Sequence, residues 1–187
     1  TTACKWDTVI PFEDMWERLN KLIKPNGAIV LFGSEPFSSA LNFSNIKNYK
    51  YSWVWKKSLK TGFQLSRKRP LKQHELISVF YKRQPTYNPQ GVKPYGKITK
   101  RGSTGENWAE MGSNEYFQEF TNYPTQILEF PNTKGVHPTQ KPVALMEYLI
   151  KTYTNENELV LDFTMGSGTT GVACKNLNRN FIGVELD

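Results

Sequence analysis

Residues 159–187 read LVLDFTMGSGTTGVACKNLNRNFIGVELD, and the order of features along them predicts an architecture. A short apolar strand over Leu159–Leu161 is followed by a glycine-rich turn and then by a helix over Thr170–Leu177. A second apolar strand follows at Phe181–Val184. Strand, loop, helix and strand in this succession are typical of a parallel sheet in an α/β domain, so we expect that class of fold.

Each of these two strands ends in an acid, Asp162 after the first and Glu185 after the second. Between them, Gly166 and Gly168 let the backbone pass close to a ligand, because glycine has no Cβ and tolerates unusual φ angles. An acid that ends the second strand can accept hydrogen bonds from both hydroxyls of a ribose. The unit therefore predicts a nucleoside-cofactor site at the carboxyl edge of the sheet.

The glycine spacing also matches the dinucleotide pattern G-x-G-x-x-G, with Gly171 as the third glycine. A carboxylate at the strand end, however, repels a pyrophosphate and suits the ammonium of a methionine moiety. We expect Thr169 or Thr170 to cap the helix that follows. A glycine turn that serves packing alone is the alternative interpretation of the same residues.

Residues 162–170 resemble the cofactor loop D-P-F-x-G-S-G-T-T of the amino-methylating DNA methyltransferases. The H-P-T-Q-K-P run at 137–142 is identical to an element that precedes this loop in the β class of that family, where the cofactor loop comes last. The strand at 53–57 resembles the family's W-x-K strand, and residues 74–82 resemble its H-E-x-I-x-x-F-x-K strand.

This resemblance implies S-adenosylmethionine as cofactor and a Rossmann-like α/β methyltransferase fold, with a mostly parallel sheet flanked by helices. It also implies one catalytic domain over residues 1–187, with an irregular target-recognition insertion at 83–134. Glu185 would hold the ribose, and Thr139 and Lys141 would fix the carboxylate end of the cofactor. The other implied cofactor contacts are Asp162, Phe163, Thr164, Gly166, Ser167, Gly168 and Thr169.

Two features depart from the family pattern. Phe163 and Thr164 follow Asp162 where the family has Pro and then Phe, which leaves the packing of the adenine open. The catalytic tetrapeptide, D-P-P-Y or a variant of it, is absent, and residues 1–7 look like the stretch that directly follows it. We therefore expect the catalytic residues upstream of Thr1, on a strand in the middle of the family's sheet, and a chain that is incomplete at both ends.

The basic residues are unevenly distributed. The range 56–101 contains 13 Lys/Arg and one acid, whereas the rest of the chain contains 11 Lys/Arg and 16 acids. A polyanion is the natural partner of such a segment, although a solvated basic surface is the plainer explanation. We expect double-stranded DNA as the partner, bound through Arg67, Lys68, Arg69, Lys93, Lys97, Lys100 and Arg101.

Periodicity predicts further elements before the final unit. Helices are expected at 11–23 and 143–153, and a helix is expected to run into Leu41. Strands are expected at 28–32, where an apolar run suggests burial on both faces, at 49–55 and at 76–81. Proline and glycine interrupt any period from 82 to 134, so an irregular stretch is expected there.

Composition excludes several classes of protein. Two widely spaced cysteines, Cys4 and Cys174, suit reduced thiols in a cytoplasmic protein rather than a disulfide framework. No apolar run is long enough to cross a membrane. No cluster of His, Cys or carboxylate residues accompanies His74 at metal-ligand spacing, so no metal site is expected. The family resemblance is compatible with a homodimer.

Several functions fit these observations. The first is methylation of adenine at N6, with exocyclic attack on a base flipped out of the duplex. Cytosine-N4 enzymes share the same loop and motif order. A non-catalytic DNA-binding relative and an RNA or small-molecule methyltransferase are further alternatives, and a dehydrogenase would need a nicotinamide site for which no candidate is visible.

Overall fold

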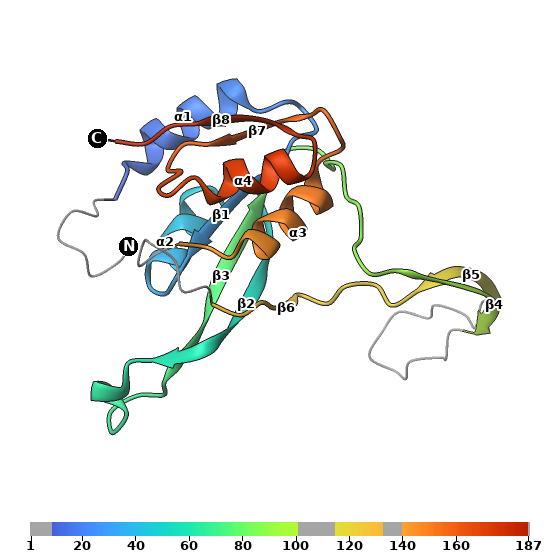
Figure 1. Ribbon diagram of the computed structural model, residues 1–187, viewed down its shortest axis with the longest axis horizontal. Helices are drawn as coiled ribbons and strands as arrows, with labels where there is room; N and C mark the ends of the chain where they lie inside the picture. The colour runs from blue at the N-terminus through green and yellow to red at the C-terminus, as the bar shows by residue number, and fades with distance from the viewer. Residues whose placement is uncertain (1–8, 101–114, 133–139, 187) are drawn as a thin grey trace. The chain divides into compact units, whose positions relative to one another are not determined.

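The computed structural model describes residues 9–100, 115–132 and 140–186, which form parts of two compact units (Figure 1). The larger unit comprises Thr1–Asn88 and Gln126–Asp187, and the smaller one comprises Pro89–Thr125. Elements of the larger unit are α1 (Phe12–Leu22), β1 (Ile29–Gly33), α2 (Phe37–Ser44), β2 (Tyr49–Thr61), the 3-10 turn η1 (Phe63–Leu65), β3 (Lys72–Phe80), β6 (Ile127–Glu129), α3 (Val143–Tyr153), β7 (Leu159–Asp162), α4 (Thr169–Asn176) and β8 (Asn180–Gly183).

Two sheets make up the centre of the larger unit. The first has the strand order β1-β3-β2-β6, and the second pairs β7 with β8. β1 and β2 both pair antiparallel with β3, whereas β6 pairs parallel with β2. Three strands of the first sheet therefore run in one direction and only β3 opposes them. β7 and β8 are parallel, with Asp162 opposite Gly183, as the final sequence unit predicted.

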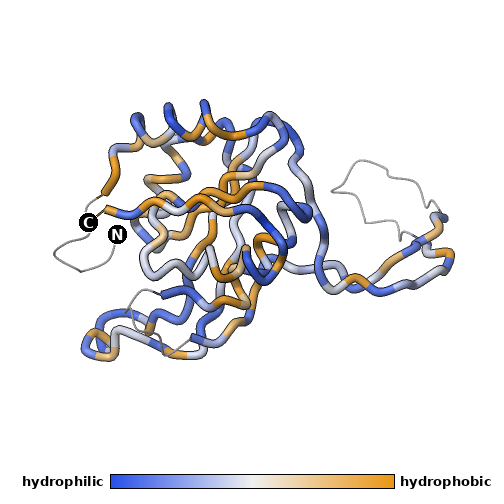
Figure 2. The backbone as a smooth tube through the Cα atoms, turned by 45° about the horizontal axis from the view of Figure 1, so that its top comes forward, coloured by the Kyte–Doolittle hydropathy of each residue, from blue (hydrophilic) through white to orange (hydrophobic). Residues whose placement is uncertain are grey.

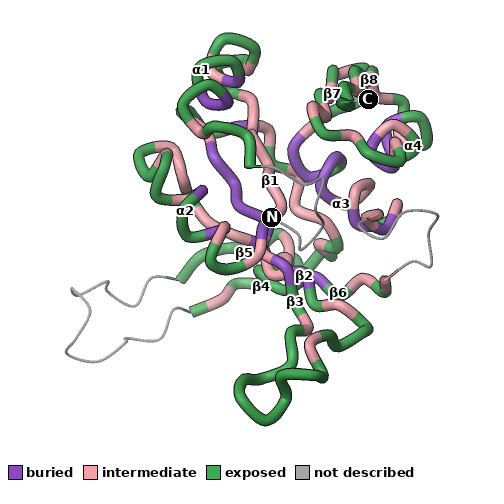
Figure 3. Tube along the Cα trace, turned by 90° about the vertical axis from the view of Figure 1, so that its left-hand side faces the viewer, coloured by how far each residue is buried: buried purple, intermediate pink, exposed green. Residues whose placement is uncertain are grey.

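Helices cover both faces of the four-stranded sheet (Figure 3). One core cluster packs Trp53 and Ile77 of the sheet against Leu145 and Leu149 of α3. A second cluster packs Phe80 against Trp16 of α1 and neighbouring residues of α2. Ile77 and Phe80 point to opposite faces because side chains alternate along a strand. α4 completes the larger unit by packing on α3 through Cys174 and Ala173.

β1 differs from the strand that its sequence predicts. Its residues Ile29–Phe32 are half-buried rather than buried on both faces. The reason is its position at one end of the four-stranded sheet, where one edge of β1 has no strand partner among the described residues. The apolar run remains visible as a hydrophobic stretch at the centre of the unit (Figure 2).

The smaller unit is an antiparallel pair of strands, β4 (Lys93–Lys100) and β5 (Glu115–Thr121), with Ile98 opposite Phe117. The irregular stretch expected from 82 to 134 is thus a small insertion that is regular in part, because β4, β5 and β6 lie within it. Strand pairing overrides local proline and glycine here: Pro94 and Gly96 sit beside a register shift, where the ladder needs no regular hydrogen bonds.

Other elements agree with the sequence within a few residues, including both long helices. β2 and β3 are longer than predicted because they continue past the core as a two-stranded arm. Within the described ranges, no helix is both long and apolar enough to cross a membrane.

Candidate cofactor site

The glycine loop joins the end of β7 to the start of α4. Its glycines Gly166 and Gly168 have φ angles of +50° and +75°, which side-chain-bearing residues rarely adopt. A Cβ built on either one meets no atom within 4 Å, so the space beside both residues is open. The two glycines are thus required by backbone conformation, and they leave room for a ligand against the loop.

Asp162 is held in place by the loop that follows it. Its Oδ1 accepts a 3.1 Å hydrogen bond from the backbone N–H of Thr164, and its Oδ2 accepts a short one from the hydroxyl of Thr170. Gly168 precedes α4, and no side chain caps that helix, so the expectation of a threonine cap is wrong. Thr170 instead orients the carboxylate, a role that the sequence did not suggest.

Glu185 lies just beyond the end of β8 and contacts the same loop. Its Oε2 accepts a 2.6 Å hydrogen bond from the backbone N–H of Gly166. The neighbouring backbone bonds Met165 N–H to Val184 O, 3.1 Å, and Val184 N–H to Asp162 O, 2.9 Å, continue the β7–β8 pairing into the loop. Both predicted acids therefore bracket the glycine loop.

A cavity of about 1100 Å³ opens beside this loop. Small-molecule sites commonly enclose roughly 300–1,000 Å³, so the cavity is large enough for a nucleoside cofactor. Glu185 contacts the loop through Gly166, and Thr139 lies outside the described residues. The predicted cofactor residues that line the cavity are Asp162, Phe163, Thr164, Gly166, Ser167, Thr169 and Lys141.

Phe163, the aromatic residue that stands one position earlier than in the family pattern, packs toward the cluster of Met15, Trp16 and Leu19 on α1. It also lines the cavity. Its ring therefore joins the hydrophobic core on one side and leaves part of its surface to the cavity on the other.

A buried ion cluster forms another part of the cavity wall. Glu75 of β3, which is 9% exposed, pairs with Lys57 of β2 at 2.7 Å and with Lys141 at 3.1 Å. The two ammonium groups lie over the rings of Trp55 and Phe32, at 4.7 and 5.1 Å from the ring centres. The sequence predicted a site role for Lys141 alone, although Lys57 and Glu75 stand in the two strands that resemble family motifs. Opposite charges on β2 and β3 would have suggested the ion pair between Lys57 and Glu75. That inference requires knowing that the two strands pair, which the sequence alone does not show.

Charge decides the protonation state of this cluster. Burial acts to raise the pKa of the Glu75 carboxyl, but the charge of Lys141 and the ion-paired hydrogen bond from Lys57 outweigh it, so the pKa is lowered. Glu75 is therefore ionised at neutral pH, and the cluster carries one net positive charge.

Two further observations bear on chemistry. Burial raises the pKa of the Cys174 thiol to about 11, which agrees with the expected reduced thiol and not with a nucleophile. Cys4 lies outside the described residues. Among the residues that the structure describes, no group of three or more His, Cys, Asp or Glu could hold a metal ion.

A family model described as DNA methylase (N6_N4_Mtase) matches residues 5–187 of this chain. The chain belongs to this DNA methylase family.

Relatives of this chain agree with the family assignment. The chain is 31% identical over 191 residues to the Type II methyltransferase M2.LlaDCHI of Lactococcus lactis subsp. cremoris, covering 97% of this chain and 66% of that protein. The chain thus spans just under two thirds of that relative's length. The crystal structure of the M1.HpyAVI-SAM complex is 34% identical, with a TM-score of 0.62, over 93% of this chain and 75% of that one.

The PvuII DNA methyltransferase (cytosine-N4-specific) shares the fold, with a TM-score of 0.71 at 17% identity over 94% of this chain and 65% of that one. The α/β methyltransferase fold predicted from the sequence is therefore confirmed.

The predicted DNA contacts of the chain fall in both units. Arg67, Lys68 and Arg69 lie in the turn between β2 and β3 of the larger unit, and all three are exposed. Lys93, Lys97 and Lys100 lie on β4 of the smaller unit and are also exposed. Lys100 pairs with Glu115 across the ladder at 2.8 Å. Arg101 lies outside the described residues.

Two strands that each end a sheet among the described residues line the large cavity. β1 ends the four-stranded sheet, β7 ends the two-stranded one, and both strands line the cavity. Leu161 and Ile182 on the β7–β8 pair are 37% and 49% exposed.

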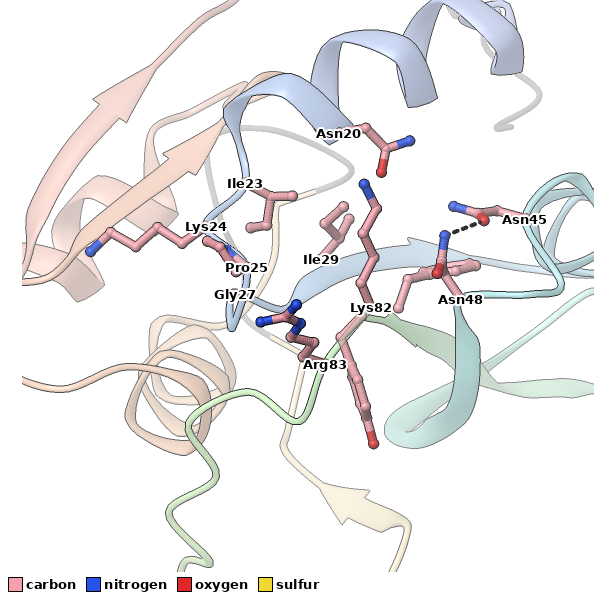
Figure 4. Close-up of a pocket in the computed structure, with 12 residues that line it drawn as sticks. Asn20, Ile23, Lys24, Pro25, Gly27, Ile29, Asn45, Asn48, Lys82 and Arg83 are labelled. Atoms are coloured by element: carbon pink, nitrogen blue, oxygen red, sulfur yellow. Dashed lines mark hydrogen bonds between the residues drawn. The ribbon is translucent and has the colours of Figure 1, made fainter.

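A second hollow of about 310 Å³ lies beside the start of β1, near Ile29 (Figure 4). Asn20, Lys82 and Arg83 line it, and Asn48 donates a 2.8 Å hydrogen bond to Asn45 at its border. None of the residues predicted to bind cofactor or DNA lines this hollow.

Proposed function

We propose that the full-length protein uses S-adenosylmethionine to methylate the exocyclic amine of adenine, at N6, in duplex DNA. Membership of the DNA methylase family supports this function, as do relatives that are named Type II methyltransferases. The observation that carries the proposal is the arrangement of Asp162 and Glu185 on either side of the glycine loop, at the carboxyl end of two parallel strands.

The residues of this site fit the proposed cofactor. Asp162 keeps lone pairs beyond its two hydrogen bonds, and an ionised carboxylate suits the ammonium of the methionine moiety. Glu185 would accept hydrogen bonds from the ribose hydroxyls, and the open space beside Gly166 would admit the sulfonium end. Lys141, with Thr139, would meet the carboxylate. The similarity of this chain to M1.HpyAVI, whose structure was solved as a complex with SAM, supports the same cofactor.

S-adenosylmethionine supplies an electrophilic methyl group when bound. The task of the chain is to hold the reacting groups in line and to exclude water, and positioning of this kind contributes much of the rate of such reactions. The glycine loop and its two acids would orient the cofactor. The groups that accept the protons of the target amine would lie on the tetrapeptide that the family resemblance places before residue 1.

For the DNA substrate, the exposed cations on the β2–β3 turn and on β4 support phosphate contacts. We assign target recognition to the range 83–134, within which the strands β4 and β5 form a separate compact unit. A two-stranded ribbon of this kind is narrow enough to enter a major groove.

Calorimetric titration of S-adenosylmethionine into the full-length protein tests the cofactor site. Binding by the wild-type protein and by Asp14→Ala, an exposed control on α1, together with loss of binding by Asp162→Ala, is the expected result. A methyl-transfer assay on two kinds of duplex then decides the target. In the first duplex only adenine amines are left to be methylated, and in the second only cytosine amines are. A folded protein that binds no cofactor would refute the methyltransferase function, and transfer to cytosine alone would replace adenine by cytosine-N4.

A further inference from the structure

The most exposed part of the larger unit is an arm formed by residues 58–72, where β2 and β3 extend beyond the core (Figures 1 and 3). The last buried residue of β2 before the arm is Trp55. At about 3.3 Å per strand residue, β2 carries the turn at Gly62 roughly 20 Å beyond that position. The arm is therefore long enough to reach a partner that the body of the unit does not touch.

The cations at the root of the arm form ion pairs, whereas those of the arm do not. Lys56 pairs with Glu129 at 2.8 Å, and Lys57 pairs with Glu75. Residues 58–72 contain no acid at all. Within the described ranges, no ion pair involves any of the arm's cations, which are Lys60, Arg67, Lys68, Arg69 and Lys72.

Large apolar side chains stand among these cations. Phe63, at the tip, is 78% exposed, and Leu59 is 62% exposed. Figure 2 shows hydrophobic residues interspersed with hydrophilic ones along the arm. Apolar side chains that are exposed together in this way commonly mark a contact surface.

The tip is an ordered turn rather than a frayed end. Gly62 adopts the left-handed conformation and η1 follows at once. Backbone hydrogen bonds of 3.0 Å join Leu65 N–H to Gly62 O and Ser66 N–H to Phe63 O. The hydrogen-bonded turn holds the backbone of Phe63 in place, so less conformational entropy is lost when a partner binds.

We propose that Phe63 is an apolar wedge that inserts between base pairs of duplex DNA from the minor groove, while Arg67, Lys68 and Arg69 contact the flanking phosphates. This inference rests on the proposed function and adds a residue that the charge pattern alone did not identify. Proteins that combine arginine or lysine with an exposed apolar residue in the minor groove unstack a base step in this way. Unstacking beside the target would lower the cost of flipping the base.

The charges favour DNA over a second copy of the chain as the partner. A symmetric contact between two arms would set the unpaired cations of one against the same cations of the other. A polyanion instead neutralises them and releases its counterions. The minor groove is about 6 Å wide and 7.5 Å deep, dimensions that admit a side chain presented on a narrow turn.

Duplex affinity at several salt concentrations tests the wedge, together with the fluorescence of 2-aminopurine beside the methylated position. Phe63→Ala should weaken binding about tenfold, the order of one lost base–aromatic stack. The dependence of affinity on salt should stay the same, because an apolar side chain releases no counterion. The rise in 2-aminopurine fluorescence on binding should shrink, and Phe63→Trp should preserve it.

Phe43→Ala is the matched control, since Phe43 is 81% exposed on α2 and lies outside the arm. Unchanged affinity and fluorescence in Phe63→Ala would overturn the wedge. So would a loss that accompanies a change in sedimentation, because that would assign Phe63 to a contact between copies. A wild-type protein that binds no duplex would instead refute the proposed function, so the two failures are distinguishable.

Discussion

The carboxylate of Glu185 accepts a 2.6 Å hydrogen bond from the backbone N–H of Gly166. A residue two positions beyond the end of β8 thus holds the loop that follows β7. The two residues are far apart in sequence but meet because β7 and β8 are parallel and end at the same edge. Hydrogen bonds to charged acceptors are among the stronger ones in proteins. Glu185 therefore shapes the loop before any ligand binds.

Replacement of Glu185 by alanine should weaken S-adenosylmethionine binding by about tenfold or more, because both the loop contact and the proposed ribose contact are lost. Titration calorimetry on the full-length protein measures this. Glu156→Ala, an exposed glutamate in the turn before β7, is the control and should bind normally. Equal affinities for the two variants would remove Glu185 from the site.

The ion cluster around Glu75 should make stability depend on pH. The pKa of Glu75 in the folded protein is lowered from 4.5, so its contribution is present above about pH 4.5 and is lost as the pH falls through the lower folded value. Glu75→Gln should therefore reduce the free energy of unfolding by about 2–4 kcal/mol at pH 7, because two partly buried lysines lose their partner.

Urea unfolding at pH 7 and at several values below pH 4.5 measures this effect. The difference between wild type and Glu75→Gln should narrow as the pH falls, since protonation of the carboxyl removes the same charge as the substitution. A difference that stays constant over this range would mean that Glu75 acts through packing and not through its charge.

The hydroxyl group of Tyr153 should by itself make a measurable contribution to the free energy of unfolding. Trp53 Nε1 donates to that oxygen at 2.7 Å, and the hydroxyls of Tyr153 and Tyr51 lie 2.8 Å apart, so the group joins α3 to β2. Tyr153→Phe leaves the buried Trp53 N–H without an acceptor and should cost about 1–3 kcal/mol in urea unfolding. Tyr81→Phe, whose hydroxyl bond to Gln84 is exposed, should change stability by less than about 0.5 kcal/mol.

The side chains of Met165 and Phe181 fill the space that a side chain at Gly183 would need. A Cβ there would overlap Met165 Sδ and lie 2.8 Å from the ring of Phe181. Gly183→Ala should destabilise the protein by about 1–3 kcal/mol and displace the loop, which should weaken cofactor binding as well.

Thermal unfolding of Gly183→Ala, Met165→Ala and the double variant completes this test as a double-mutant cycle. The double variant should lose less stability than the sum of the single variants, because the smaller side chain at 165 makes room for the new methyl group. Strict additivity would show that Met165 is not the obstacle.

Local patterns in the sequence were sufficient to predict most helices and strands and to identify the two acids of the candidate site. The helix over 143–153 matches α3 because its apolar residues recur with helical spacing. Asp162 and Glu185 could be identified because each ends an apolar strand, and the strand–loop–helix–strand order predicts that the two strands are parallel. The same reasoning missed the strands within 82–134, where β4 and β5 depend on pairing between distant residues and not on local propensity.

Neighbouring residues and composition were thus enough to predict the class of fold, the glycine loop between two acids and the concentration of positive charge between residues 56 and 101. Only the tertiary structure decided that Thr170 orients Asp162, that Glu75 joins Lys57 to Lys141 and that Phe63 stands exposed among unpaired cations. The physical reason is that strand register and chain packing set which side chains meet, and these are properties of the whole folded chain.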